Sequence, residues 1–319
     1  MFEPLNTSIA GLLFAAIAVP SLSNNEVLVQ ARETRIEDGK IVLVEQFLIR
    51  SDGGASNRVV AAALLRTLSQ EIPAAACHLH NNVDVEEAIE ELSYSVAKFD
   101  AVLLALLNGN EDIGIVGGEV RRKTVAELEA LIEAWTPIHD AAVAVLDDPS
   151  DRTSVDVIYA STDVMLEKTY HLLTEIQSEY VNPAELLQSD LMLIEISARM
   201  AMMTQTMAYE ACRVWSDEGN DALVTDLAET KQIYAASMDA LMNGLPALGI
   251  LPPPTSEIAE GLAAADADWP IIKGFLDRVV TGDPLTNEER VDLYHRLIVK
   301  VHKVEVIENL YQEYSKRIF

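Results

Sequence analysis

The sequence has few cysteines, few aromatic residues and few basic residues. Two of its 319 residues are cysteines and 6% are aromatic, so the chain is not a disulfide-rich scaffold. Its 51 acidic residues outnumber the 23 lysines and arginines, which gives a formal net charge of −28. Nucleic acid and anionic membranes repel such a chain at long range, so we expect neither as a partner.

Long hydrophobic runs are also absent. The run from Ile9 to Val19 is shorter than the roughly 20 apolar residues that span a membrane, and we expect no membrane insertion. Small residues around Ser21 and Ser23 follow it, a pattern typical of a secretory signal, although residues 1–8 contain no lysine or arginine. We expect residues 1–23 to be a signal peptide and the protein to be periplasmic; a buried N-terminal helix is the alternative.

Motifs of catalysis and metal binding are missing from the sequence. It contains no phosphate-binding glycine loop and no nucleophile elbow. The tetrapeptide CHLH (77–80) places Cys77 and His80 one helical turn apart, but no second ligand pair accompanies them. We therefore expect no enzyme activity, no cofactor and no metal site.

What the sequence does contain is an internal repeat. Cys212 lies 135 positions after Cys77, and ALMNGLPALGI (240–250) matches ALLNGNEDIGI (105–115) at the same offset. Further pairs at this offset are Asp148-Pro149 with Asp283-Pro284, Tyr159 with Tyr294, Lys168 with Lys303, and Gln177 with Gln312. A constant offset over this length indicates a tandem duplication.

Each copy is predicted to form four helices, because alanine, leucine and acidic residues dominate both copies. The capping-box pattern at Thr124–Glu127 and at Thr286–Glu289 predicts two of the helix starts. The connections are short, which favours an all-α fold of two tandem antiparallel four-helix bundles. We place module 1 at residues 55–181 and module 2 at residues 182–319.

Residues 24–54 form an extension outside the repeat. Asp38-Gly39 separates two β-rich runs within 26–50, a pattern that predicts a β-hairpin. An irregular helix is the alternative for this segment.

The first helix of each copy has a second face, away from its apolar stripe, that lacks acidic residues. It consists of Arg66, Gln70, Pro73 and Cys77 in copy one, and of Ala201, Gln205, Ala208 and Cys212 in copy two. Since acids crowd the rest of the sequence, we infer that this face is covered. The natural cover is the same face of the other copy, packed about a pseudo-two-fold axis.

Two features of this face are candidates for function. Arg66 has no acid three or four residues away, so it needs either an acid from another helix or a planar oxyanion or carboxylate ligand. Arg199 follows Glu195 by four residues, which favours a surface ion pair. The candidate ligand-binding residues are therefore Arg66, Gln70, Gln205 and Arg199. Cys77 and Cys212 form either a disulfide or two buried thiols.

The stretch ISARMAMMTQTMAYEAC (196–212) resembles the signature of the type IV pili methyl-accepting chemotaxis protein N-terminal domain. Copy one, AAALLRTLSQEIPAAAC (61–77), keeps part of this pattern, and the module is similar to the periplasmic sensor domain of nitrate/nitrite two-component kinases. The resemblance covers roughly residues 55–317 in two copies. It implies a ligand-sensing four-helix bundle that dimerises and clamps an anion between arginines of its first helices.

The motif has three arginine positions. Copy one keeps the second, as Arg66, and copy two keeps the first, as Arg199. Copy two carries Ala201 at the second position, which in the family binds nitrate, so a symmetric pair of arginines is impossible.

Two functions follow as hypotheses. In the first, the protein is a periplasmic, sensor-type binding protein that holds a small anion between its modules and presents it to a membrane receptor. In the second, it is a structural or adaptor protein that keeps the sensor fold and binds another periplasmic protein.

Overall fold

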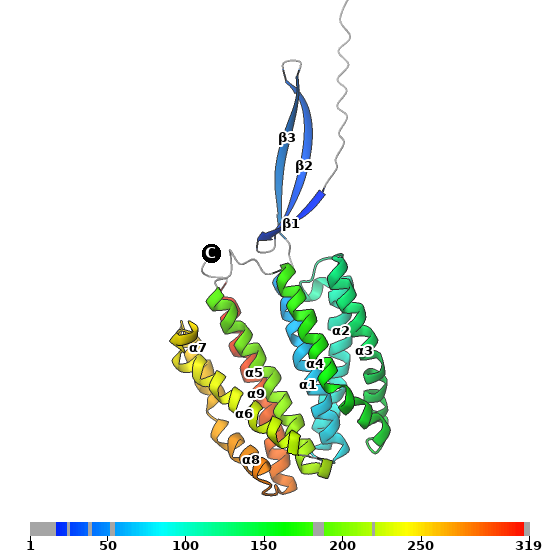
Figure 1. The fold of residues 1–319 in the computed structure, drawn as a ribbon, viewed down its shortest axis with the longest axis vertical. Helices are drawn as coiled ribbons and strands as arrows, with labels where there is room; N and C mark the ends of the chain where they lie inside the picture. The colour runs from blue at the N-terminus through cyan, green and yellow to red at the C-terminus, as the bar shows by residue number, and fades with distance from the viewer. Residues whose placement is uncertain are drawn as a thin grey trace, which may run out of the picture.

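The computed structural model describes residues 17–23, 26–37, 40–51, 55–180, 188–218 and 221–315. Most of the expected signal peptide, residues 1–23, lies outside these ranges. Helices form the body of the molecule and pack into bundles, so the all-α class predicted from the sequence is confirmed for that body (Figure 1). Among the described residues, no helix combines the length and the apolar character needed to cross a bilayer.

Module 1 is formed by four helices that run alternately up and down. They are α1 (Ala55–His80), α2 (Val85–Asn108), α3 (Arg122–Asp147) and α4 (Arg152–Tyr180). Helix α1 packs against α2 and α4, and α3 packs against α2 and α4. The amphipathic pattern of α2 explains how it packs. It buries Leu92, Phe99 and Leu106 along one stripe, and its opposite side faces solvent.

Module 2 is formed by the helices of the second copy. They are α5 (Gln188–Arg213), α6 (Asp221–Asn243), α7 (Ser256–Asp266), α8 (Trp269–Thr281) and α9 (Asn287–Ser315). The sequence predicts one helix where the structure has α7 and α8, which are separated at residues 267–268. Pro270 lies in the first turn of α8. Because proline lacks the N–H that would continue the preceding helix, a new helix begins there.

The two modules repeat local details at an offset of 135 positions, or of 134 at the tryptophan. Phe99 packs on Trp135 with ring centroids 4.3 Å apart, and Tyr234 packs on Trp269 at 4.7 Å. An isolated bridge joins Asn110 to Ile115 in one copy and Leu245 to Ile250 in the other. These details recur at equivalent places in the two modules, as the repeat in the sequence predicts.

The two bridged loops share a second feature, a glycine with positive φ. The φ angle is +72° at Gly114 and +77° at Gly249. Residues other than glycine rarely adopt this backbone conformation, which explains why both copies have glycine there.

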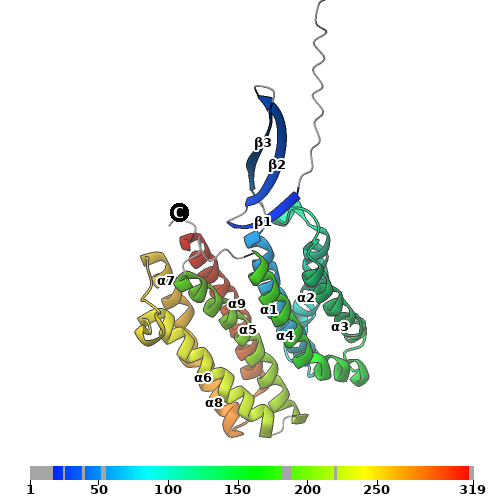
Figure 2. The same cartoon turned by 45° about the horizontal axis from the view of Figure 1, so that its top comes forward.

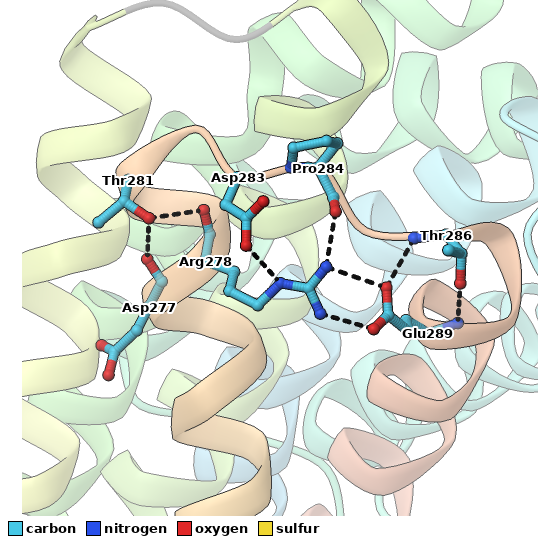
Figure 3. A network of polar contacts seen from close by, with 7 residues as sticks. All are labelled: Asp277, Arg278, Thr281, Asp283, Pro284, Thr286 and Glu289. Carbon is cyan, nitrogen blue, oxygen red and sulfur yellow. Dashed lines mark hydrogen bonds and ion pairs between the residues drawn. The ribbon is translucent and has the colours of Figure 1, made fainter.

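The observed starts of α9 and α3 can be compared with the two capping boxes predicted from the sequence. At α9, the N–H of Glu289 donates to Thr286 Oγ1 (3.2 Å) and the N–H of Thr286 donates to Glu289 Oε2 (2.8 Å), so the box at Thr286–Glu289 is confirmed (Figure 3). The box at Thr124–Glu127 is wrong. Helix α3 begins earlier, at Arg122, and Thr124 is buried within it.

Before α1, the described residues form three strands, β1 (Ile17–Ser23), β2 (Glu26–Glu37) and β3 (Lys40–Ser51). Strand β1 falls within the predicted signal peptide, and β2 and β3 form the hairpin predicted for the extension at residues 24–54. The three strands pair antiparallel in the order β1-β2-β3, with Glu26 opposite Ser51 and Glu37 opposite Lys40. The strands lie beyond one end of the helical bundles (Figures 1 and 2).

Candidate functional site between the two modules

Helices α1 and α5, the first helices of the two copies, pack directly against each other. They lie side by side where the two modules meet (Figure 2). Cys77 of α1 and Cys212 of α5 form a disulfide across this contact, with their Cα atoms 6.2 Å apart. Of the two alternatives for these cysteines, the structure shows the disulfide. We call the α1–α5 contact and its flanking residues on α2, α4 and α9 the inter-module interface.

The interface is close to symmetric. His78 of α1 stacks on Tyr294 of α9, and Arg213 of α5 lies over Tyr159 of α4, with its Cζ 4.2 Å from the ring centroid. The two contacts are equivalent, because 135 positions separate His78 from Arg213 and Tyr159 from Tyr294. Reciprocal contacts of this kind define an isologous interface, here within one chain.

Polar side chains at the centre of the interface also make reciprocal contacts between the two modules. Gln205 Nε2 donates to Glu71 Oε2 (3.1 Å), and Thr206 Oγ1 donates to Gln70 Oε1 (3.2 Å). Gln70 and Gln205 are equivalent, as are Glu71 and Thr206. The two candidate glutamines therefore each bind a side chain of the other module.

Arg66 breaks the symmetry. Its side chain is 1% exposed, and its Nη1 lies 2.7 Å from Oε1 of Glu195 on α5. This contact confirms that an acid from another helix pairs with it. Within the described part of the chain, Arg66 Nε and Nη2 have no hydrogen-bond partner. The equivalent residue in module 2 is Ala201, which is buried.

Glu195 is shared between two arginines. Nε of Arg199 lies 3.9 Å from the same Oε1 that Arg66 contacts, and Arg199 is mostly exposed. The structure therefore brings Arg66 and Arg199 together around one carboxylate. Gln70 and Gln205 lie further along α1 and α5, toward the disulfide.

The remaining residues of the predicted face are buried. Ala208 and Cys212 are fully covered. Pro73 lines a cavity of about 10 Å³ together with Trp135, Ile158 and other residues of module 1, so it packs toward its own bundle. A space of this size holds about one water molecule.

The CHLH segment has structural contacts. Cys77 is in the disulfide, and His78 Nδ1 lies 2.8 Å from the carbonyl oxygen of Ala74. His80 Nδ1 lies 2.7 Å from the carbonyl oxygen of Pro149. Within the described ranges, no group of three or more His, Cys, Asp or Glu side chains is placed to hold a metal ion.

Sequence reasoning missed two acids of the interface, Glu71 on α1 and Glu308 on the flanking helix α9. Glu71 lies between Ser95 of α2 and Gln205 of α5. Glu308 of α9 interacts electrostatically with both Arg66 and Glu195. Burial, followed by the charge of Glu305, raises the pKa of Glu308 to about 7, while Arg66 lowers it. The repeat itself gives no signal for these residues, because their partners lie on helices distant in sequence.

Residues 47–159 match the type IV pili methyl-accepting chemotaxis transducer N-terminal domain. The match covers β3 in part, α1, α2, α3 and the first turns of α4, and it does not extend to module 2. No curated protein matches the chain.

The matched segment is thus similar to a sensor-type domain, of a kind that is typically non-catalytic and is consistent with a sensory or receptor role. A second copy of this domain is not detected in module 2.

Proposed function

We propose that the protein is a non-enzymatic, exported sensor-type protein that binds a small oxyanion or carboxylate between its two modules, at Arg66. The observation that carries the proposal is that the buried guanidinium of Arg66 has too few hydrogen-bond partners among the residues that the structure describes. A guanidinium has five N–H donors, and buried charges are costly unless they are well paired. Only Nη1 of Arg66 has a hydrogen-bond partner within the described residues.

The arrangement also offers a way for an anion to enter. Glu195 is 29% exposed, and its carboxylate lies between Arg66 and Arg199. A planar anion that displaces this carboxylate from Arg66 leaves Glu195 with a second cation to pair with. Glu195 therefore acts as a tethered competitor for the ligand in this proposal.

The disulfide supports the proposed location. Disulfides form and persist in oxidising compartments such as the periplasm. A periplasmic sensor-type protein with bound anion would then act on a membrane receptor or another periplasmic protein.

A thermal-shift series with nitrate, nitrite, acetate and larger carboxylates tests the proposal. A ligand at 100 times its Kd stabilises the folded state by about 2.7 kcal/mol, which raises Tm measurably. We expect one of these anions to stabilise the wild type, no shift in Arg66→Gln, and a larger shift in Glu195→Gln. Arg199→Ala is expected to weaken the shift, because the displaced Glu195 then loses its second cation. Arg152→Ala, which removes another exposed arginine with an acid four residues away, is the matched control and keeps the shift. If no anion stabilises the wild type, anion binding at Arg66 is wrong.

An adaptor role is the second candidate, and a different observation favours it. The polar side chains at the centre of the interface already pair across the modules, and a disulfide joins them. In this version the interface is permanently closed, and the outer surface binds a protein. Cross-linking in periplasmic extract tests it: a specific adduct that forms equally with wild type and Arg66→Gln supports the adaptor role.

A further inference from the structure

One carboxyl group connects three helices of the inter-module interface. Glu71 belongs to α1 and is 7% exposed. Its Oε1 lies 2.5 Å from Ser95 Oγ of α2, and its Oε2 accepts a hydrogen bond from Gln205 Nε2 of α5. Glu71 thus connects the core of module 1 to module 2.

The contacts of Ser95 accommodate a proton on Glu71. Ser95 Oγ lies 2.5 Å from Glu71 Oε1 and 2.5 Å from the carbonyl oxygen of Glu91. Both contacts are hydrogen-bond distances, but a hydroxyl has one proton and a carbonyl has none. If Ser95 donates to the carbonyl of Glu91, the second proton belongs to Glu71.

The surroundings of Glu71 favour its neutral form. The charges with the largest influence on it are two acids, Glu91 from α2 and Glu305 from α9. From α5 it meets the neutral amide of Gln205. Burial, followed by these acids, raises the pKa of Glu71 well above its usual range, while the hydrogen bond with Ser95 lowers it. Other titratable groups around the cluster are Asp84, Glu87, Tyr94, Tyr294, His302 and Glu308.

We propose that this carboxyl cluster makes the inter-module interface a proton-sensing site, with Glu71 as the group that titrates. When protonated, Glu71 links Ser95 to Gln205 and holds the modules together. When ionised, it adds a third negative charge beside Glu91 and Glu305. The interface then opens around Glu71 so that water can reach the charge. This stimulus is separate from anion binding at Arg66, and either function can exist without the other.

The disulfide determines where the interface opens. Cys77 is six residues after Glu71 on α1, about 9 Å along the helix at 1.5 Å per residue. The covalent bond to Cys212 holds the modules together at that level. Opening therefore takes place on the other side of Glu71, toward Arg66 and Glu195.

The distance between the modules at different pH values tests the proposal. Val120, in the loop between α2 and α3, and Leu248, between α6 and α7, are 86% and 62% exposed. Spin labels on Val120→Cys and Leu248→Cys report the separation of the modules by pulsed electron spin resonance, with the native disulfide intact. We expect the distance distribution to lengthen or broaden between pH 6 and pH 9. In the same protein with Glu71→Gln, the distribution is expected to stay constant.

Two further variants guard the interpretation. Glu91→Gln removes one neighbouring charge, so the pH of the transition is expected to be lower. This variant tests the proposal if Glu71→Gln does not fold. Glu210→Gln is the matched control. Burial raises the pKa of Glu210 to about 8, but its carboxylate accepts a hydrogen bond from Thr230 within module 2. This control is expected to keep the wild-type transition. A constant distance in the wild type, or the same transition in Glu71→Gln, would overturn the proposal.

Stability provides a second readout that anion binding does not affect. An acid whose pKa is raised by folding binds more protons in the folded state, so stability falls as pH rises toward the folded pKa. We expect the Tm of the wild type in anion-free zwitterionic buffer to fall between pH 7 and pH 9, and to fall less in Glu71→Gln. His78 does not contribute in this range, because it is neutral in both states there. An equal fall in both proteins would contradict a titrating Glu71.

Discussion

The imidazole of His78 in α1 stacks on the ring of Tyr294 in α9, with ring centroids 3.7 Å apart and planes inclined by 10°. The same position in the other copy is Arg213, which lies over Tyr159. An imidazole and a guanidinium are both flat, so either can stack on a tyrosine. The duplicated chain has kept the geometry of this reciprocal contact while changing the side chain, as expected when a symmetric interface is retained within one chain.

His78 is expected to make the protein less stable in weak acid. Burial lowers its pKa to about 4, so the folded state keeps it neutral while the unfolded chain takes up a proton below pH 6.5. Stability is therefore lost as pH falls from about 6.5 toward 4, by roughly 3 kcal/mol at 1.36 kcal/mol per unit of pKa difference. His78→Phe keeps a flat ring and removes this loss.

The measurement is the difference in unfolding free energy between wild type and His78→Phe, from urea titrations at several pH values. The difference should move in favour of the variant between pH 7 and pH 4.5. Comparing the two proteins cancels the opposite contribution of the buried carboxyls. A constant difference would show that His78 is not held neutral.

The disulfide is expected to supply a large share of the stability of the two-module unit. It closes a loop between residues 135 positions apart, and cross-links of this length restrict the unfolded chain by about 4–5 kcal/mol in the chain-entropy model. We expect Cys77→Ala/Cys212→Ala to lower the denaturant midpoint by a corresponding amount. Adding a thiol reductant during unfolding should bring the wild type down to the midpoint of the variant. The variant is its own control, since its midpoint should not respond to reductant.

Local signals in the sequence predicted part of the fold. The Thr286–Glu289 pattern predicts a helix start because both capping side chains reach the backbone there. The same pattern at Thr124–Glu127 fails because other residues start α3 first. The carbonyl oxygen of Arg121 accepts the N–H of Val125, so the first turn of α3 closes around Thr124. A four-residue pattern cannot report where the preceding backbone starts the helix.

The candidate site could be predicted only in outline. The need of Arg66 for a partner follows from its own helix, because that need is local. That the partner is Glu195 depends on the register between α1 and α5, which packing determines. The same holds for Glu71, whose partners Ser95 and Gln205 lie 24 and 134 positions away. Such contacts become visible only when the helices are placed side by side.

Lys300 is expected to be replaceable by an apolar residue. It is fully buried in module 2, where its Nζ lies 2.8 Å from Asp268 Oδ1 and donates to the carbonyl of Ala265 at 2.6 Å. The equivalent residue in module 1 is Met165. Replacing a buried ion pair by apolar side chains is often neutral or stabilising, whereas removing one partner costs about 3–5 kcal/mol. We expect Asp268→Asn to be strongly destabilising and Lys300→Met to be mild.

Denaturant unfolding of both variants and of the double variant tests this. The double variant Lys300→Met/Asp268→Asn should be more stable than Asp268→Asn alone, because it no longer buries an uncompensated ammonium group. Lys303 pairs with Asp268 at 3.2 Å and gives the carboxylate a second cation in Lys300→Met. If Lys300→Met costs as much as Asp268→Asn, the ion pair itself is required.

The connection between α8 and α9 depends on one glutamate. Glu289 accepts hydrogen bonds from Arg278 Nη1 (2.6 Å) and Nη2 (3.1 Å), and it also caps α9 (Figure 3). The same guanidinium contacts Asp283 and the carbonyl oxygen of Pro284. The ion pair with Arg278, followed by the backbone N–H of Thr286, lowers the pKa of Glu289 to about 2.

Glu289→Gln is expected to loosen the start of α9 less than Glu289→Ala does. Glutamine can still complete a capping box but cannot form the ion pair with Arg278, whereas alanine can do neither. Hydrogen exchange at the N–H groups of Thr286 and Glu289 should therefore quicken in the order wild type, glutamine, alanine. Glu288→Ala, at the exposed neighbouring position, is the control. In the wild type the protection should persist at pH 4 and decline toward pH 2, since a carboxylate with a depressed pKa contributes above its unfolded pKa and is lost as pH falls through the folded one. Equal exchange in the glutamine and alanine variants would mean that Arg278, rather than the capping box, holds this connection.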